Sequence, residues 1–220
     1  GVSQHVHGTD NARCLIALAL MTGQIGRPGT GLHPLRGQNN VQGASDAGLI
    51  PMMYPDYQRV DSETARMRFE KLWNAKLDTK PGLTVVEIMR EADAGRIRGM
   101  YIMGENPMMS EPDLNHTRHQ MEQLEFLVVQ DLFLTETARL ATVVLPAASG
   151  AEKSGSFTTV DNRVQCFERA VAPAGQARTD SEILAKLHSL VAPVTAITAQ
   201  SAEELHHLFA GEILGEAMVL

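Results

Sequence analysis

The sequence has little cysteine, no excess of basic charge and no long apolar run. No stretch approaches the roughly 20 apolar residues that a membrane span requires, so we expect no direct membrane span in this chain. The two cysteines, Cys14 and Cys166, lie far apart, and neither has a Cys-x-x-Cys partner. No cysteine-based metal or cluster site is therefore readable. Cys14 lies in an apolar helical pattern, and we predict a buried thiol there.

Charge and length limit the class of protein. A net charge of −7 argues against a general nucleic-acid binder, which normally carries a basic face, but it leaves room for one local anion site. The 220 residues suffice for one large domain or two small ones. No secretory signal pattern is present, and we expect a cytoplasmic protein. Because the chain starts at Gly1 without methionine, we expect an excised part of a longer protein or a processed one.

Residues 36–48, RGQNNVQGASDAG, combine glycines, side-chain amides, one arginine and one aspartate, with almost nothing to bury. Glycines allow positive φ and close backbone approach, amides supply paired donors and acceptors, and arginine offers a planar fork for an anion. The stretch is either an exposed surface loop or a loop folded around a ligand rich in hydrogen-bonding groups. It lies within residues 23–55, which show no convincing helical or strand period, and such long irregular stretches are usually functional or disordered.

Three short apolar runs, at residues 100–103, 126–129 and 142–145, alternate with predicted helices at 112–123 and 135–140. This alternation predicts an α/β fold with a doubly wound, mainly parallel, Rossmann-like sheet. In such sheets ligands bind outside the carboxyl ends of the strands, and right-handed crossovers bring those ends to one edge. The residues that follow the three runs are polar or small: Gly104-Glu105-Asn106-Pro107, Gln130-Asp131 and Pro146-Ala147-Ala148-Ser149.

The remaining pattern predicts further helices and one hairpin. Thr84 and Glu87 form a capping box that opens a helix, which should end near Gly95. The other predicted elements are helices at 10–21 (with Gly23 as the C′ residue), 61–74 (with Met67, Leu72 and Trp73 buried), 180–190 and from 201, and a hairpin with strands at 156–158 and 163–167.

No set of catalytic residues is complete, but several polar residues and glycines can form a ligand-binding surface. Each of these candidate residues also has a purely structural explanation that the sequence leaves open. Arg36 can pair with any surface carboxylate, and Gly104 can simply end a strand. Asn106 precedes a proline, which is a favoured turn pair. Gln130 can cap the following turn, and Asp180 is well placed as the N-cap of a helix at 181–190.

The ordered motifs of the chain resemble the molybdopterin oxidoreductases, and most closely the alpha (catalytic) subunits of formate dehydrogenases. The likeness covers about residues 1–190. It rests on RGQNNVQGASDAG, on the glycine-rich segment before it, and on GVSQH, YIMGENP, VQDLFLTETA, VVLP and GSFT, which occur in order. This chain departs from the family pattern at Thr142, where aspartate is usual, at Ala147, where relatives can have serine, and at 161–163, which is less rich in arginine.

The resemblance implies a molybdenum or tungsten ion held by two pterin guanine dinucleotides, and oxidation of formate to carbon dioxide with two-electron transfer to the metal. Arg36 matches the arginine close to the metal and substrate, where it would orient the formate anion. Gln38 and the loop after it would lie against a pterin dinucleotide, and Asp180 would suit a guanine edge. The implied cofactor-binding residues are Gln4, Gly37, Gln38, Asn39, Gly104, Asn106, Ser110, Gln130 and Asp180, with Arg36 as the catalytic residue.

The resemblance also implies the middle of a catalytic subunit. Residues 1–36 would end one α/β cofactor-binding domain and carry the arginine loop. Residues 37–190 would form the pterin-guanine-dinucleotide domain, and 191–220 would be an unmatched helical tail. The metal ligand (cysteine or selenocysteine) and an iron–sulfur cluster would precede this segment, so no residue here is expected to bind metal. Partners would be formate, the remaining domains of the subunit, and iron–sulfur electron-transfer subunits, with no nucleic acid.

Two other functions stay open. The chain can belong to a non-catalytic structural or assembly subunit of the same fold, or to another molybdopterin oxidoreductase with a different small substrate. The presence of Arg36, Gln38, Asn106 and Gln130 favours cofactor binding, because a structural relic has no reason to keep these residues.

Overall fold

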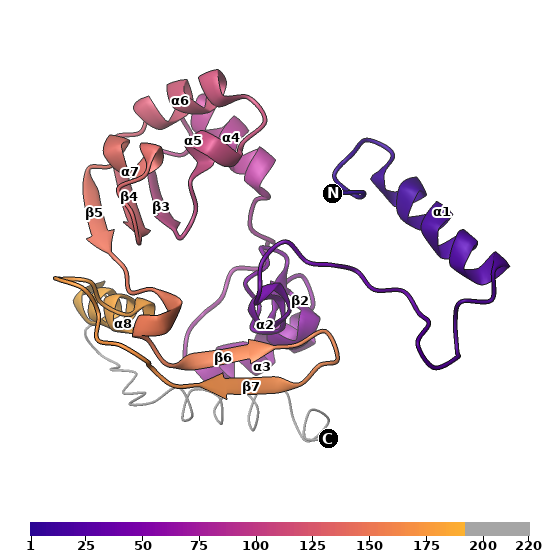
Figure 1. Ribbon diagram of the computed structural model, residues 1–220. Helices are drawn as coiled ribbons and strands as arrows, with labels where there is room; N and C mark the ends of the chain where they lie inside the picture. The colour runs from indigo at the N-terminus through magenta and orange to yellow at the C-terminus, as the bar shows by residue number, and fades with distance from the viewer. Residues whose placement is uncertain (192–220) are drawn as a thin grey trace. The chain divides into compact units, whose positions relative to one another are not determined.

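The computed structural model describes residues 1–191 (Figure 1). They form two compact units, Gly1–Val41 and a second unit that starts at Gln42. The predicted helix from residue 201 and the predicted tail lie outside the described residues. Within residues 1–191, no helix has the length and apolar character needed to traverse a bilayer.

The first unit contains one regular element, helix α1 (Gly8–Met21). Its run of alanine and leucine residues has high helix propensity, and the helix ends at Thr22, before Gly23 with a φ of +63°. The predicted helix and its C′ glycine are confirmed. The prediction of a buried Cys14 is wrong: no other helix or strand lies within residues 1–40 to cover α1, and the thiol is exposed.

A short helix, α2 (Val41–Asp46), forms inside the glycine- and amide-rich stretch, where the sequence indicated no regular element. Gln42 Nε2 donates to Asp46 Oδ1 over 2.8 Å, an i, i+4 pair that supports one helical turn. The helix is followed by Gly48, whose φ is +84°. A Cβ at this position would lie 2.6 Å from the backbone nitrogen of Pro55, so only glycine fits the turn.

A small substructure follows α2 in the second unit. Its elements are strand β1 (Met53–Tyr54), 3-10 helix η1 (Pro55–Tyr57), strand β2 (Gln58–Arg59), which pairs antiparallel with β1, and helix α3 (Glu63–Trp73). Ser62 is the N-cap of α3, since its Oγ accepts from the Ala65 N–H at 3.4 Å. Asn74 ends the helix in the left-handed region, with a φ of +48°. The helix predicted at 61–74 is therefore confirmed.

The buried face of α3 differs from the predicted one. Phe69 is completely buried and packs in a cluster with Tyr54 and Ala65. Met67 and Trp73, which we expected to be buried, are 62% and 43% exposed, so that prediction is wrong. Ala65 and Phe69 are four residues apart and share one face of the helix, whereas Met67 lies two residues from each, on the other side. Trp73 lies at the edge of the cluster, with its ring centroid 5.0 Å from that of Phe69.

The second unit is built on a three-stranded parallel sheet in the order β3-β4-β5 (Figure 1). Its elements are α4 (Val85–Asp93), β3 (Gly99–Met103), α5 (Pro107–Ser110), α6 (Leu114–Glu122), β4 (Phe126–Asp131), α7 (Glu136–Leu140) and β5 (Val143–Pro146). The three predicted strands and their parallel pairing are confirmed. Helix α5 was not predicted, because four residues are too few to show a helical period.

One face of the sheet carries the main core. Ile102, Leu127 and Val129 pack there with Met89 of α4 and Met121 of α6. Leu127 and Val129, in the central strand β4, are 2% and 0% exposed, as expected for a parallel strand covered by helices. This core fixes the position of β4, the middle strand.

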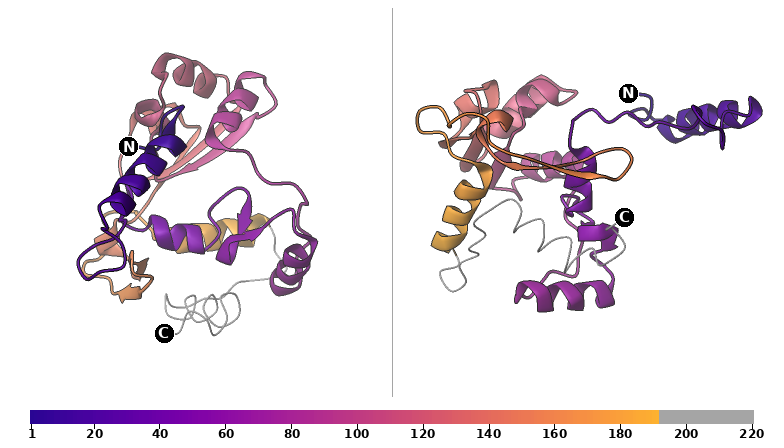
Figure 2. Two further views of the ribbon diagram at one scale, coloured as in Figure 1. Left: turned by 90° about the vertical axis from the view of Figure 1, so that its right-hand side faces the viewer. Right: turned by 60° about the horizontal axis from the view of Figure 1, so that its bottom comes forward.

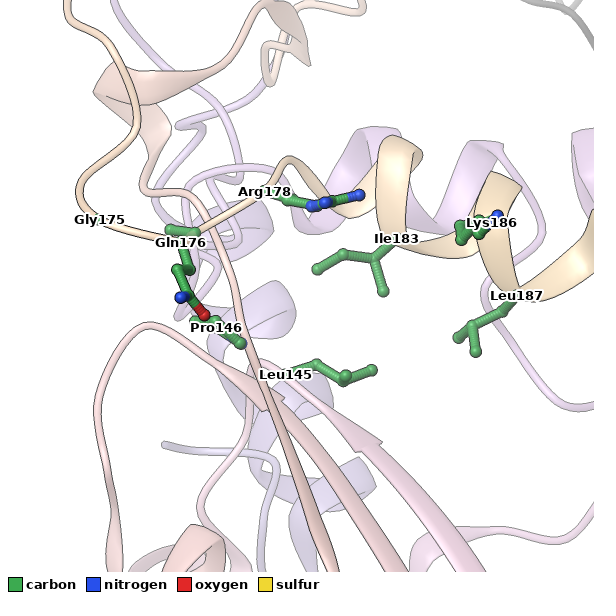
Figure 3. A pocket seen from close by; sticks show the side chains of 9 residues that line it. Leu145, Pro146, Gly175, Gln176, Arg178, Ile183, Lys186 and Leu187 are labelled. Carbon is green, nitrogen blue, oxygen red and sulfur yellow. The ribbon is translucent and has the colours of Figure 1, made fainter.

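On the opposite face of the sheet, helix α8 (Asp180–Val191) lies at the carboxyl end, where Asp180 bonds to Gln130, whereas Tyr101 and Met103 are 40% and 44% exposed. Gln130 and Leu145 pair in register and point to this face, because they alternate with core residues along their strands. Leu145 and Ile183 both line a cavity of about 620 Å³ between β5 and α8 (Figure 3). The predicted α/β fold with a mainly parallel sheet is confirmed.

Between β5 and α8 the chain forms η2 (Gly150–Glu152) and an antiparallel hairpin of β6 (Gly155–Thr158) and β7 (Val164–Phe167) (Figure 1, Figure 2). The predicted hairpin is confirmed. Its two strands pair in an antiparallel ladder, and Phe157 stacks on Phe167 across it, with ring centroids 4.8 Å apart.

Glu87 is expected to stabilise α4 only while it is ionised. The hydroxyl of Thr84 and then its N–H, both donating to Glu87 Oε2 over 2.7 Å, hold the pKa of Glu87 below its usual value. A carboxyl with a lowered folded pKa adds stability above its unfolded pKa of about 4.3, and this is lost as pH falls through the folded pKa. Glu87→Gln should therefore lower the thermal midpoint at neutral pH and flatten its fall below about pH 4.

The control for this prediction is Glu122→Gln in the last turn of α6. Glu122 is exposed and lies 3.6 Å from Arg118, so the substitution removes the same charge without touching a cap. It should leave the pH dependence of the midpoint nearly unchanged. Identical pH curves for Glu87→Gln and the parent chain would contradict the role given to the capping box.

Candidate functional site

The ends of β3 and β4 are joined at a glycine. Gly104 follows β3 with a φ of +64°, and its N–H donates to the carbonyl of Gln130 at 2.9 Å. This left-handed conformation carries no Cβ penalty for glycine. The bond extends the parallel pairing one step beyond the strand and holds the 104–107 turn beside the end of β4.

Four side chains form one hydrogen-bonded chain at this edge, which we name the Asp180 network: Tyr101, Gln130, Lys153 and Asp180. Gln130 is completely buried. Its Nε2 donates to Asp180 Oδ1 over 2.6 Å, and its Oε1 accepts from the Tyr101 hydroxyl. The other oxygen of Asp180, Oδ2, accepts from the Lys153 ammonium. The buried amide is therefore satisfied at both ends.

Tyr101 enters the Asp180 network as a proton donor. Partial burial, and secondly the charge of Asp180, raise the pKa of Tyr101 above its usual value of about 10. The phenol is therefore neutral at physiological pH, and it donates to the amide oxygen of Gln130. This bond determines which end of the amide faces which partner.

The structural alternative for Asp180 is wrong, because its neighbour caps α8. Thr179 Oγ1 accepts from the Glu182 N–H at 3.3 Å, and Glu182 Oε2 accepts from the Thr179 N–H at 2.9 Å. The carboxylate of Asp180 is thus free to bond Gln130 and Lys153. The alternative for Gln130 is also wrong, because its side chain bonds to Tyr101 and Asp180 and does not cap the following turn.

Asn106 ties two neighbouring loops together. Its Oδ1 accepts from the N–H and the hydroxyl of Thr137, at 3.2 and 2.6 Å. Its Nδ2 donates to Glu136 Oε2 at 2.9 Å and lowers the pKa of that carboxyl. Ser110, in α5, donates to Glu105 Oε1 at 2.6 Å. Asn106 therefore does more than form a turn with the following proline: it joins the end of β3 to the first turn of α7.

The other predicted site residues lie in the first unit and are exposed: Gln4, Arg36, Gly37, Gln38 and Asn39. Arg36 forms no ion pair within residues 1–191, so the structure gives no support to pairing with a surface carboxylate. The structure brings Gly104, Gln130 and Asp180 together in the second unit. The approach of Arg36 and Gln38 to them stays a prediction.

Tyr101 and Lys153 were not among the site residues predicted from the sequence. Tyr101 pairs in register with Val128 on the same sheet face as Gln130, so its position follows once the register is known. Lys153 lies 27 residues before Asp180, and no local pattern links the two. That contact could be found only from the tertiary structure.

A parallel sheet with polar side chains at its carboxyl edge defines an open α/β ligand-binding fold. The family described as molybdopterin oxidoreductase has a model that matches residues 1–190. The chain belongs to the molybdopterin oxidoreductase family, and the predicted resemblance is confirmed. The family implies a pterin cofactor that carries molybdenum or tungsten.

Two relatives and one solved structure illustrate the likeness. The F420-dependent formate dehydrogenase subunit alpha of Methanocaldococcus jannaschii is 51% identical over 187 residues, covering 85% of this chain and 27% of that protein. Formate dehydrogenase H of Escherichia coli is 39% identical over 211 residues, covering 94% of this chain and 30% of that protein. The chain thus spans less than a third of either relative. The solved structure of acetylene hydratase from Pelobacter acetylenicus shares the fold, with a TM-score of 0.50 and 16% identity. The match covers 65% of this chain and 21% of that one.

Proposed function

We propose that this chain is a segment of a molybdenum- or tungsten-dependent formate dehydrogenase that oxidises formate to carbon dioxide. The observation that carries the proposal is the 51% identity over 187 residues to a formate dehydrogenase alpha subunit. In this function the second unit contributes the pterin guanine dinucleotide site, and the first unit contributes the active-site Arg36.

The exposed part of Asp180 fits one guanine. The side chain is 30% exposed, and its bonds to Gln130 and Lys153 use one acceptor position on each oxygen. A carboxylate has about four such positions, so one on each oxygen stays open. Guanine presents the N1 and N2 hydrogens side by side, which matches two adjacent acceptors. Asn106 and Ser110 lie on the neighbouring turn and supply further polar groups for the dinucleotide.

Arg36 would bind formate. A guanidinium is planar and always charged, and it can hold a carboxylate through two parallel hydrogen bonds. Within residues 1–191 no carboxylate forms an ion pair with Arg36, which leaves its charge available to a small anion. Its role is to orient formate and to stabilise the charge that develops as the C–H bond breaks. Gln38 and the loop that follows would lie along a pterin dinucleotide.

The metal of the cofactor, when bound, would supply the acceptor for the two electrons that are released as formate becomes carbon dioxide and a proton. Its cysteine or selenocysteine ligand and the iron–sulfur cluster would come from other parts of the subunit. Electrons would then pass to iron–sulfur partner subunits, and we place the enzyme in the cytoplasm.

Formate-dependent reduction of a viologen dye tests this function. The full-length protein should show it and should contain molybdenum or tungsten. The isolated 220-residue chain should show none, because the expected metal ligand lies outside it. A metal-loaded full-length protein that oxidises another small substrate but not formate would contradict the assignment of formate. Turnover by the isolated chain would contradict its assignment as a segment.

A further inference from the structure

The side chains of the Asp180 network come from four separate parts of the chain. Tyr101 is in β3, Gln130 is in β4, Lys153 directly follows η2, and Asp180 is the first residue of α8. The hydrogen bonds join residues that are 27, 29 and 50 positions apart. The network therefore forms only when the sheet, the loop after β5 and α8 are folded together.

Gln130 is a fixed link in this network. Its side chain is 0% exposed, so a bound molecule cannot reach the amide without displacing a partner. Reversing the amide would turn its oxygen toward the Asp180 carboxylate, and two acceptors would then face each other. The Tyr101 hydroxyl and Asp180 therefore hold a single orientation of the amide, and a buried amide left unpaired would cost free energy.

The carboxylate of Asp180 is held on both oxygens. Gln130 holds Oδ1, and Lys153 holds Oδ2. An aspartate carboxylate that is held by nothing has a broad distribution of χ2 angles, whereas two donors at opposite oxygens restrict it to one plane. The side chains of Lys153 and Asp180 are 31% and 30% exposed, so part of the pair is accessible to a ligand.

We propose that Tyr101, Gln130 and Lys153 are positioning residues that orient Asp180 to accept guanine and to reject adenine. This inference rests on the proposed guanine dinucleotide site. Guanine offers two adjacent donors, at N1 and N2. Adenine has a donor at N6 but an acceptor at N1, so its edge places one lone pair against a carboxylate oxygen. A site that accepts two hydrogen bonds discriminates strongly against a ligand that lacks one donor.

The test uses the full-length protein prepared without cofactor and measures binding of GMP, IMP and AMP by calorimetry. The parent protein should bind GMP at least about tenfold more tightly than AMP, with IMP, which lacks the N2 amino group, in between. Lys153→Met should weaken GMP binding about tenfold and change AMP binding little, so the ratio falls. Lys153→Arg can donate to the same oxygen and should restore most of the ratio. Tyr101→Phe should lower the ratio by a smaller factor.

Lys71→Met is the matched control, because Lys71 is an exposed lysine in the last turn of α3. It should leave the ratio unchanged. An unchanged GMP-to-AMP ratio in Lys153→Met, or an equal loss for all three nucleotides, would overturn the positioning role while the guanine site stands. If the parent protein showed no preference for GMP, both the positioning role and the proposed guanine site would be contradicted. If Lys153→Met does not fold, a ratio unchanged in Tyr101→Phe overturns the proposal.

Discussion

Arg36→Ala in the full-length protein is expected to lower formate turnover about 100- to 1,000-fold, which is the usual effect of removing one preorganised donor from an active site. Arg36 has no ion-pair partner within residues 1–191, so its loss should break no ion pair of the described residues. Metal and pterin content should therefore stay close to the parent value. Steady-state kinetics with formate, together with metal analysis of the same preparation, measure both quantities.

Two further variants make this result specific. Gln38→Ala, two residues away, should mainly loosen cofactor retention, because Gln38 is assigned to the pterin dinucleotide and not to formate. Arg13→Ala removes an exposed arginine from α1 and should leave both quantities unchanged. If Arg36→Ala and Gln38→Ala lost metal equally, the division between substrate binding and cofactor binding in this loop would be wrong.

Phe69→Ala is expected to lower the free energy of unfolding of the small substructure around α3 by about 3–5 kcal/mol. Phe69 is completely buried, with ring centroids 4.9 Å from Tyr54 and 5.0 Å from Trp73. Alanine would leave a cavity that these two rings cannot fill without losing their own contacts. The sequence has one tryptophan, Trp73, so its fluorescence during a urea titration reports on this cluster directly.

Met67→Ala provides a control on the same helix. Met67 is 62% exposed, and its loss should change the free energy of unfolding by no more than about 0.5 kcal/mol, as is usual at the surface. The pair of variants also tests which face of α3 is buried. A larger loss for Met67→Ala than for Phe69→Ala would mean that the helix packs with the face that the sequence originally suggested.

The sheet could be predicted because each strand is short, apolar and bounded by polar or small residues. Leu127 and Val129 lie in a run that alternates with helices, as expected for a covered parallel strand. The burial of Cys14 could not be predicted in the same way. An apolar helical pattern shows that a helix has a side to cover, but it does not show which segment of the chain covers it. Helix α2 depends on one side-chain pair and on the turn at Gly48, and neither leaves a periodic signal.

The polar residues of the candidate site could be predicted from the sequence, but most of their contacts could not. The family resemblance pointed to Gln130 and Asp180, and the structure places them in contact. The sequence could not decide between a cap and a site residue at 180, because Thr179 and Asp180 are adjacent and both are good N-caps. Lys153 was missed because only the packing of the loop after β5 against α8 brings it to Asp180.

The start of α8 has a consequence for how this protein can change in evolution. Thr179 and Glu182 form the capping box of the helix, so its N-terminal cap does not depend on the residue at 180. If the ligand-binding aspartate were also the N-cap, each substitution of it would change ligand preference and would also weaken the helix by about 1 kcal/mol. Here the two properties are carried by neighbouring residues. A substitution at position 180 can therefore change nucleotide preference and leave the helix cap intact.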